Sequence, residues 1–223
     1  MNLPIVLCMA TRPHLRNTTR ERLDDTTGSP LWSDAALDEY LAAAIRTYGV
    51  AIPRAATAAT AAVAEAATSV ALPGGVAETG IVAVRDAHGR DVPRASQRQG
   101  PAPADAAHLV QAWSAWAGTL RLQRPAAGDE VGAWAIDYLA GRELVGDDVT
   151  PQPIDAGDEP IVVALAAAQA MERRVVEDAK RGIAGAGRVS IATSPAAELR
   201  AEAARLIAAR KRRVRGGYVT QAG

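Results

Sequence analysis

The strongest candidate for chemistry in this 223-residue chain is a basic cluster near its C-terminus, where five cations fall within six residues. Such a run can contact phosphates, dock on an acidic protein surface, or remain a solvated helix end whose cations suit the helix dipole. The glycine pair after the cluster frees the chain to leave the helix direction, and the next two residues offer an extended anchor for a partner. The residues concerned are Arg210, Lys211, Arg212, Arg213, Arg215, Tyr218 and Val219.

The acids, histidines and single cysteine of the chain form no catalytic pattern. The carboxylate pairs Asp24–Asp25 and Asp147–Asp148 lie in turn-like contexts, where such side chains commonly cap the backbone or meet solvent. The three histidines lack metal-ligand spacing, and Cys8 has no Cys-His context. The run GIAGAG at 182–187 lacks the preceding strand that a dinucleotide-binding loop requires. We therefore expect no enzyme, no cofactor and no metal.

Composition limits the class of protein further. The formal net charge is zero, so no global field attracts nucleic acid or a membrane surface. A single cysteine cannot form an internal disulfide, which is typical of folding in a reducing compartment. The apolar start, MNLPIVLCMA, has no basic region before it and is too short to span a bilayer, so we expect an N-terminal arm and no membrane segment.

The clearest element is a helix within Leu31–Tyr48. Ser33 is a natural N-cap, and Trp32 and Leu37 occupy the positions of a hydrophobic staple. An apolar stripe follows at helical spacing, and we expect the helix to end near Gly49. Its stripe consists of Leu37, Tyr40, Leu41, Ala44, Ile45 and Tyr48.

A weaker helix is expected before it, over residues 13–23. Its polar faces carry four arginines, which favour a solvated face, with contact to an acidic partner or to DNA phosphates as the sharper alternative. These are Arg12, Arg16, Arg20 and Arg22.

The pattern changes between about Ala51 and Pro153, where short alternating runs predict four to six antiparallel strands with turns at His88–Gly89 and Ala117–Gly118. The threonines and valines of residues 54–72 favour strand over helix there. The aromatic residues of this region can be read as a base-stacking platform, but their strand spacing favours the sheet core for most of them. They are Trp113, Trp116, Trp134 and Tyr138.

Helices return after this β region. Asp158 and Glu159 suit a helix start as cap and dipole partner, and Ser194–Pro195 suits another. The first half of the earlier helix is apolar on nearly every face, so it is buried within a bundle or against another subunit. The candidate subunit-interface residues are Trp32, Tyr40, Ile161, Val162 and Leu165.

The order of these segments resembles the head-tail connector (adaptor) proteins of tailed bacteriophages and related particles. The resemblance is carried by RLDD within residues 20–25, by WSDAALDEYLAAAIRTY at 32–48, by the β region around 117–141, by the long helix of 158–181, and by the last helix with its basic tail. It implies an α+β fold, with a scaffold of about four helices and an inserted small antiparallel β-sheet or sandwich. The expected parts are residues 1–50, 51–155 and 156–213, with a flexible docking tail at 214–223.

The resemblance also implies a function. A connector forms a ring, twelve copies in this family, that joins the portal of the DNA-filled head to the tail and extends the DNA channel. The expected partners are the portal protein, a tail-side neck protein, further copies of the chain and the DNA that passes through. The resemblance assigns portal docking to the basic tail, and places the protein in the virion neck after assembly in the host cytoplasm. The alternative is a small DNA-binding accessory protein that uses the arginine cluster.

Overall fold

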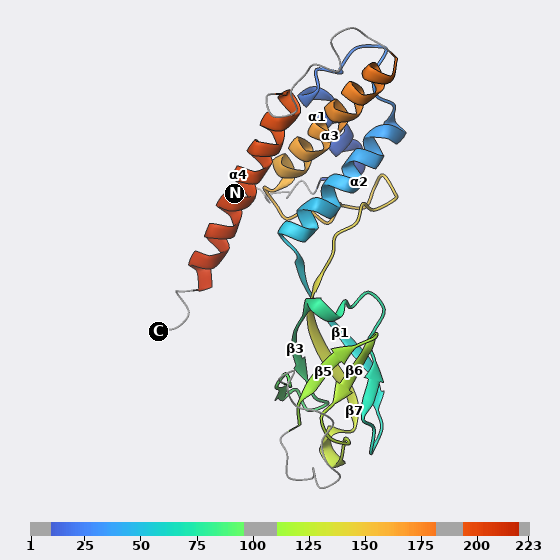
Figure 1. The fold of residues 1–223 in the computed structure, drawn as a ribbon, viewed down its shortest axis with the longest axis vertical. Helices are drawn as coiled ribbons and strands as arrows, with labels where there is room; N and C mark the ends of the chain where they lie inside the picture. The colour runs from blue at the N-terminus through green and yellow to red at the C-terminus, as the bar shows by residue number, and fades with distance from the viewer. Residues whose placement is uncertain (1–9, 96–110, 182–193, 219–223) are drawn as a thin grey trace, which may run out of the picture. The chain divides into compact units, whose positions relative to one another are not determined.

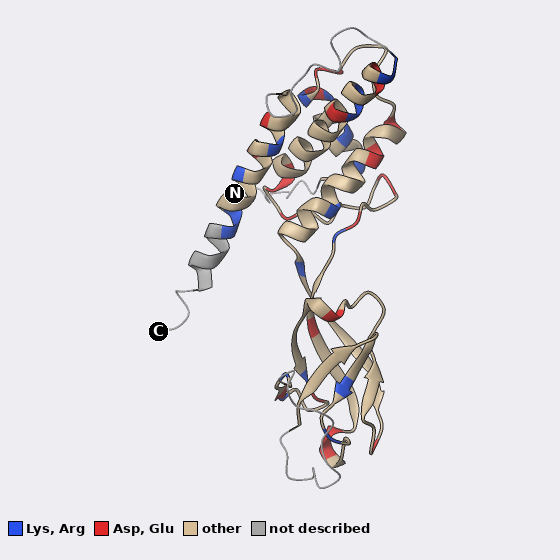
Figure 2. Ribbon diagram, viewed as in Figure 1, with Lys and Arg blue, Asp and Glu red and all other residues tan. Residues whose placement is uncertain are grey.

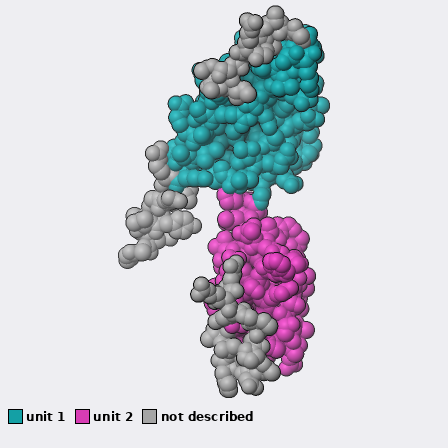
Figure 3. Space-filling model, viewed as in Figure 1, with its two compact units in different colours: residues 1–52, 141–223 teal, residues 53–140 magenta. Residues whose placement is uncertain are grey.

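The computed structural model describes residues 10–95, 111–181 and 194–218, with side chains described as far as residue 211. The chain divides into two compact units (Figure 1; Figure 3). A helical unit combines residues 1–52 with residues 141–223, and a β unit consists of Pro53–Ala140. The fold is α+β, as expected: helices from both sides of the β unit in sequence pack together.

The expected boundary at residue 155 is wrong, because the β unit ends at Ala140. The reason lies in Arg142, whose side chain is only 3% exposed. Its guanidinium donates to the carbonyl oxygens of Ile52 and Pro153 at 3.0 and 2.8 Å, and to both carboxylate oxygens of Asp155 at 3.0 Å. The segment that follows the last strand is therefore built into the helical unit.

The helical unit has four helices in the described part of the chain. The third helix is central, because each of the other three packs against it. Their bounds are α1 Arg12–Arg22, α2 Asp34–Ala51, α3 Glu159–Lys180 and α4 Pro195–Tyr218. The core comprises the buried side chains Leu15, Leu37, Leu41, Ile45, Tyr48, Ile161, Val162, Leu199 and Ala203 with a run of alanines from α3.

Local sequence explains how α2 begins. Ser33 Oγ accepts a hydrogen bond from the backbone N–H of Ala36 at 3.2 Å, which confirms the predicted N-cap. The expected apolar stripe is buried except for Tyr40, which is half-buried. The helix ends two residues later than expected, at Ala51. Asp158 occupies the N-cap position of α3 and Glu159 its first turn, as expected, but the Asp158 side chain makes no cap hydrogen bond and accepts from Tyr48 of α2 and Arg210 of α4 instead.

The β unit contains two antiparallel sheets. One has four strands in the order β1-β7-β3-β4, and the other has three in the order β2-β6-β5. The alanine-rich segment forms strand β1, as its threonines and valines predicted, and pairs with β7 from Arg54↔Ala140 to Val63↔Gly132. The strands are β1 Arg54–Val63, β2 Ser69–Ala71, β3 Ile81–Arg85, β4 Asp91–Val92, β5 Trp113–Trp116, β6 Thr119–Leu122 and β7 Gly132–Ala140, with short 3-10 helices η1 Glu78–Gly80 and η3 Gly128–Glu130.

Both predicted hairpin turns are present, β3 with β4 and β5 with β6. Ala117 and Gly118 both have positive φ, at 53° and 72°, so the second turn needs residues that tolerate the left-handed region. The side chains that point between the sheets form a core separate from that of the helical unit. It includes Val63, Val84, Trp113, Leu120, Trp134 and Ile136.

Candidate docking surface

A groove between α2 and α3 is lined from both helices and has a volume of about 650 Å³. Tyr40 forms part of its wall, and burial, with Glu177 nearby, raises the pKa of the Tyr40 phenol. Val176 is 47% exposed at its rim. Gln169 also lines this groove, and its Oε1 is buried without a hydrogen-bond partner among the described residues.

A second groove lies beyond Val176, between α3 and the start of α4, and holds about 550 Å³. Trp32 lines it together with Met171 and Val175, and Pro195 of α4 contributes another apolar wall. Glu172 and Val176 line both grooves, so the two form one surface. The first groove mixes charged and apolar walls and the second is mostly apolar, and a surface with an aromatic in each groove is typical of protein contact.

Two of the five predicted interface residues therefore lie on an accessible surface, namely Trp32 and Tyr40. The prediction is wrong for Ile161 and Val162, which are 3% and 0% exposed inside the core of their own chain. Leu165 is half-buried against the same core. Of the two alternatives for the apolar half of α3, burial within a bundle is correct, because α1, α2 and α4 surround that helix.

Three of the four arginines of α1 are mostly buried in ion pairs of the helical unit, and only Arg22 is exposed. Arg16 donates to both carboxylate oxygens of Asp38 at 2.6 Å, and Arg20 donates to Asp25 at 2.9 Å and to Asp34 at 2.7 Å. The hydrogen bond from Arg20 lowers the pKa of Asp34. Arg12 pairs with Asp148 at 2.7 Å. These cations hold α1 against α2, against the turn between α1 and α2, and against the segment that contains Asp148. Their charge is neutralised by acids of the same unit.

The acidic pairs noted in the sequence have structural roles as well. Asp25 is 5% exposed. It accepts from the backbone N–H groups of Leu31 and Trp32 at 2.6 and 3.3 Å, which fixes the entry to α2. Asp147 accepts from the N–H groups of Val149 and Thr150, as a turn-capping carboxylate does.

Arg210 was expected in the docking cluster, and the structure corrects its role. Its Nε donates to Asp158 Oδ2 at 3.1 Å, and its Nη2 lies 3.6 Å from Asp155 Oδ2. Asp158 is 6% exposed, so Arg210 compensates a buried charge. Lys211 is exposed, while the side chains of Arg212, Arg213, Arg215 and Tyr218, and all of Val219, lie outside the described residues.

The backbone of α4 continues to Tyr218, five residues past the expected end of the scaffold at Arg213. The helix therefore includes Gly216 and Gly217, which were expected to end it. Figure 2 shows basic residues along α4 as far as its side chains are described, whereas the ribbon of the β unit is mostly uncharged. Portal docking by this end of the chain stays a prediction.

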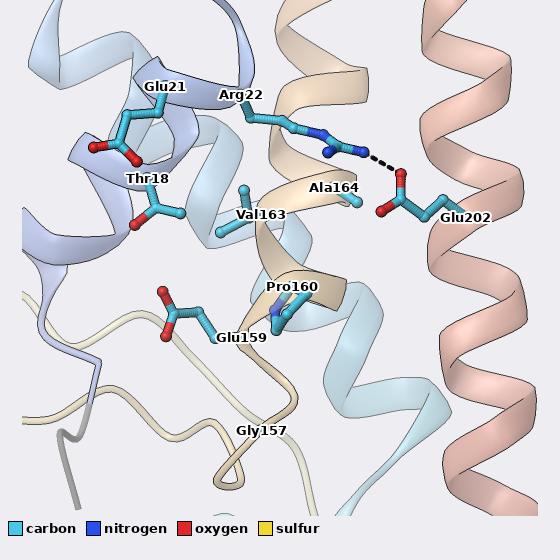
Figure 4. Close-up of a pocket in the computed structure, with 9 residues that line it drawn as sticks. All are labelled: Thr18, Glu21, Arg22, Gly157, Glu159, Pro160, Val163, Ala164 and Glu202. Carbon is cyan, nitrogen blue, oxygen red and sulfur yellow. Dashed lines mark hydrogen bonds and ion pairs between the residues drawn. The ribbon is translucent and has the colours of Figure 1, made fainter.

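A third groove, of about 640 Å³, lies among α1, the start of α3 and α4. Figure 4 shows Arg22 reaching from α1 to Glu202 of α4, and this ion pair bridges the groove. Glu21 and Glu159 also line it, but Glu159 pairs with His14 at 2.7 Å. No group of three or more His, Cys, Asp or Glu side chains in the described part of the chain is placed to hold a metal ion.

The aromatics of the β unit divide between core and surface. Trp113 and Trp134 are buried, and their indole N–H groups donate to the backbone oxygens of Val92 and Glu130 at 2.9 and 2.8 Å. Tyr138 packs partly against the same core. Trp116 is 65% exposed, so one aromatic is too few for a stacking platform.

Sequence reasoning missed Val175, Val176 and Met171 as surface residues, because a helical stripe does not show whether a neighbouring helix covers it. The charged residues at 172–178 were the only sequence signal that this half of α3 is partly exposed, because charged side chains are seldom buried in a core. Within the described residues, no helix is long and apolar enough to cross a membrane. A comparison with protein-family models and one with curated proteins both found no match.

Proposed function

We propose that this chain is a structural protein of the neck of a tailed bacteriophage or related particle. It would form a ring that joins the portal to the tail and extends the DNA channel. One observation supports this most: the WSD helix of the resemblance is the capped helix α2, within a helical unit made from both chain ends around an inserted β unit.

The proposal assigns portal docking to the end of α4 and the residues beyond it. Arg210 anchors that helix to Asp155 and Asp158, so the cations after Arg210 extend from a fixed base. The docking residues are then Lys211, Arg212, Arg213, Arg215, Tyr218 and Val219. A helix held at its base loses less conformational entropy on binding than a free tail does.

Reconstitution with the portal protein of the same particle tests the proposal directly. Electron microscopy of the mixture is expected to show a ring of this chain on one face of the portal, and the resemblance implies twelve copies. A chain that never joins the portal, at any ratio or salt concentration, would rule out the neck assignment.

The same preparation tests the DNA-binding alternative. Contacts to phosphates predict affinity for random duplex DNA that falls by roughly 0.9 log units per log unit of salt for each neutralised phosphate. The arginines of α1 are already paired with acids, so this alternative assigns the phosphate contacts to the end of α4. Tight, salt-dependent binding without portal association would replace the neck proposal with the accessory-protein one.

A further inference from the structure

The outer face of α2 carries a pattern that the proposed function does not use. Six residues, the α2 outer stripe, lie opposite the buried stripe of the helix, and none of the six is buried. Val50, at the end of the stripe, is 87% exposed. The stripe consists of Ala35, Glu39, Ala42, Ala43, Arg46 and Val50.

Glu39 and Arg46 are the charges of this stripe, and neither has a side-chain partner among the described residues. Charges on the facing part of α3 are paired within the chain: Arg173 with Glu177 at 3.2 Å and Arg174 with Asp178 at 2.9 Å. The α2 outer stripe therefore keeps one acid and one base available beside the α2–α3 groove, which Glu39 and Arg46 both line.

The spacing of these two residues has a symmetry. They are seven residues apart, close to two helical turns, so they share one face at a separation of about 10 Å along the axis. Their midpoint falls between Ala42 and Ala43, and the midpoint of Ala35 and Val50 falls at the same place. The acidic Glu39 and the basic Arg46 thus lie at equal distances from one centre, and so do the small Ala35 and the larger Val50.

We propose that the α2 outer stripe is a contact between two copies of this chain, packed antiparallel about a two-fold axis between Ala42 and Ala43. Such an axis places Glu39 opposite Arg46 of the partner subunit and Ala35 opposite Val50 of the partner subunit. Both ion pairs form at once, because the contact is self-complementary. The central alanines let the two helices approach to about 8 Å, the short end of the usual range.

The charge pattern favours a second copy over an unrelated partner. Binding to an unrelated partner would not require the stripe to be complementary to itself. A two-fold contact does require this, because each residue must face the residue that lies equally far on the other side of the centre. A two-fold contact closes on itself and builds no larger ring. The inference therefore concerns the free protein before assembly, and goes beyond the proposed neck ring.

Charge reversal tests the contact in the full-length chain. Sedimentation equilibrium over a concentration series is expected to show a dimer, and Glu39→Arg or Arg46→Glu alone to weaken it about tenfold or more. An equal mixture of the two variants is expected to dimerise again, because each supplies the charges that the other lacks. The double variant Glu39→Arg/Arg46→Glu is expected to do so as well.

Matched controls are available on α4. Glu198 and Arg205 are also exposed, seven residues apart and without a partner among the described residues, but neither lines any of the three grooves described above. Their reversal is expected to leave the dimer unchanged, and circular dichroism checks that every variant is folded. A wild-type monomer at all concentrations, dimers that survive the single reversals, or a mixture that fails to dimerise would each overturn the inference. None of these outcomes bears on the portal experiment.

Discussion

The phenol of Tyr48 donates a hydrogen bond to Asp158 Oδ2 at 2.9 Å, across 110 positions of sequence. The phenol oxygen also accepts from the backbone N–H of Asp155 at 3.3 Å. Burial raises the pKa of Tyr48, so its hydroxyl keeps its proton throughout the neutral range. The guanidinium of Arg142 lies 4.9 Å from the centre of the same ring. Tyr48 thus fastens the end of α2, just before the chain leaves the helical unit, to the start of α3.

Replacing Tyr48 by phenylalanine is expected to destabilise the helical unit. The change keeps the ring but removes the hydroxyl, and leaves a buried carboxylate with one donor fewer, at a cost of about 1–3 kcal/mol. Urea unfolding followed by circular dichroism at the helical band measures the difference. Tyr40→Phe is the control, since the Tyr40 hydroxyl has no hydrogen bond among the described residues. Equal stabilities of the two variants would contradict the role given to the bond.

Gly49 is expected to resist replacement by alanine although it lies inside a helix. Alanine normally stabilises a helix interior by about 1 kcal/mol relative to glycine. Here a Cβ would stand 2.9 Å from the backbone nitrogen of Arg142, and no flexible side-chain end is there to move aside. We expect Gly49→Ala to cost about 1–3 kcal/mol in the same unfolding measurement.

Gly141→Ala is the matched control for this steric argument. An added Cβ there meets nothing within 4 Å, and the residue does not have positive φ. A change within about 0.5 kcal/mol is expected. A stabilised Gly49→Ala protein would mean that the approach of Arg142 to α2 is looser than the structure shows.

The start of α2 could be predicted because a cap depends on residues next to one another in sequence. Ser33 and its acceptor role need no knowledge of the rest of the chain. The β strands were also recognisable, since the alternation that buries Trp134 and Ile136 is a property of the strand itself.

Pairs between distant residues could not be predicted. Arg22 and Glu202 are 180 positions apart, and nothing near either one indicates the other. The arginines of α1 therefore looked like a solvated face, and Arg210 looked available for a partner. The sequence shows a charge, but only the packing of α1, α3 and α4 determines which acid neutralises it.

Acid is expected to weaken the β unit through Asp137. The Thr57 hydroxyl donates to its carboxylate at 2.6 Å, and this bond lowers the pKa of Asp137, with Arg85 at 2.7 Å acting in the same direction. A lowered folded pKa means that the stabilisation is complete above the unfolded value of about 4, and is lost as pH falls through the folded value.

Urea unfolding at a series of pH values, followed by tryptophan fluorescence, measures this dependence. Trp113 and Trp134 are buried in the β unit and report its unfolding. The Asp137→Asn protein is expected to lose less stability than wild type as the pH drops below about 4. Glu65→Gln serves as the comparison, because Glu65 is exposed and has no partner among the described residues. Parallel pH profiles for wild type and Asp137→Asn would contradict the assignment.

Each unit is expected to fold alone, because each has its own core. Arg54 and Ala140 are partners in the β1–β7 ladder, so the ends of the β unit lie side by side and a short Gly-Ser bridge can replace it. Deleting residues 54–140 should leave a helical circular dichroism signal. Deleting residues 54–153 instead removes Arg142 and its contacts, and should abolish cooperative unfolding. Loss of the helical signal in the shorter deletion would show that the two cores depend on each other.

Truncation after Arg213 is expected to separate stability from docking. The last described contacts of α4 with its unit come from Leu206, Ile207 and Arg210, so removing residues 214–223 should leave the thermal transition of the helical unit unchanged. Arg210→Gln provides the opposite case. It uncouples a cation from the buried Asp158, and should lower stability by about 1–3 kcal/mol while the docking end stays complete. Under the proposed function, only the truncated protein fails to bind the portal in a pull-down. If the truncated protein binds as wild type does, the end of α4 is a solvated helix terminus, and portal contact must lie elsewhere on the chain.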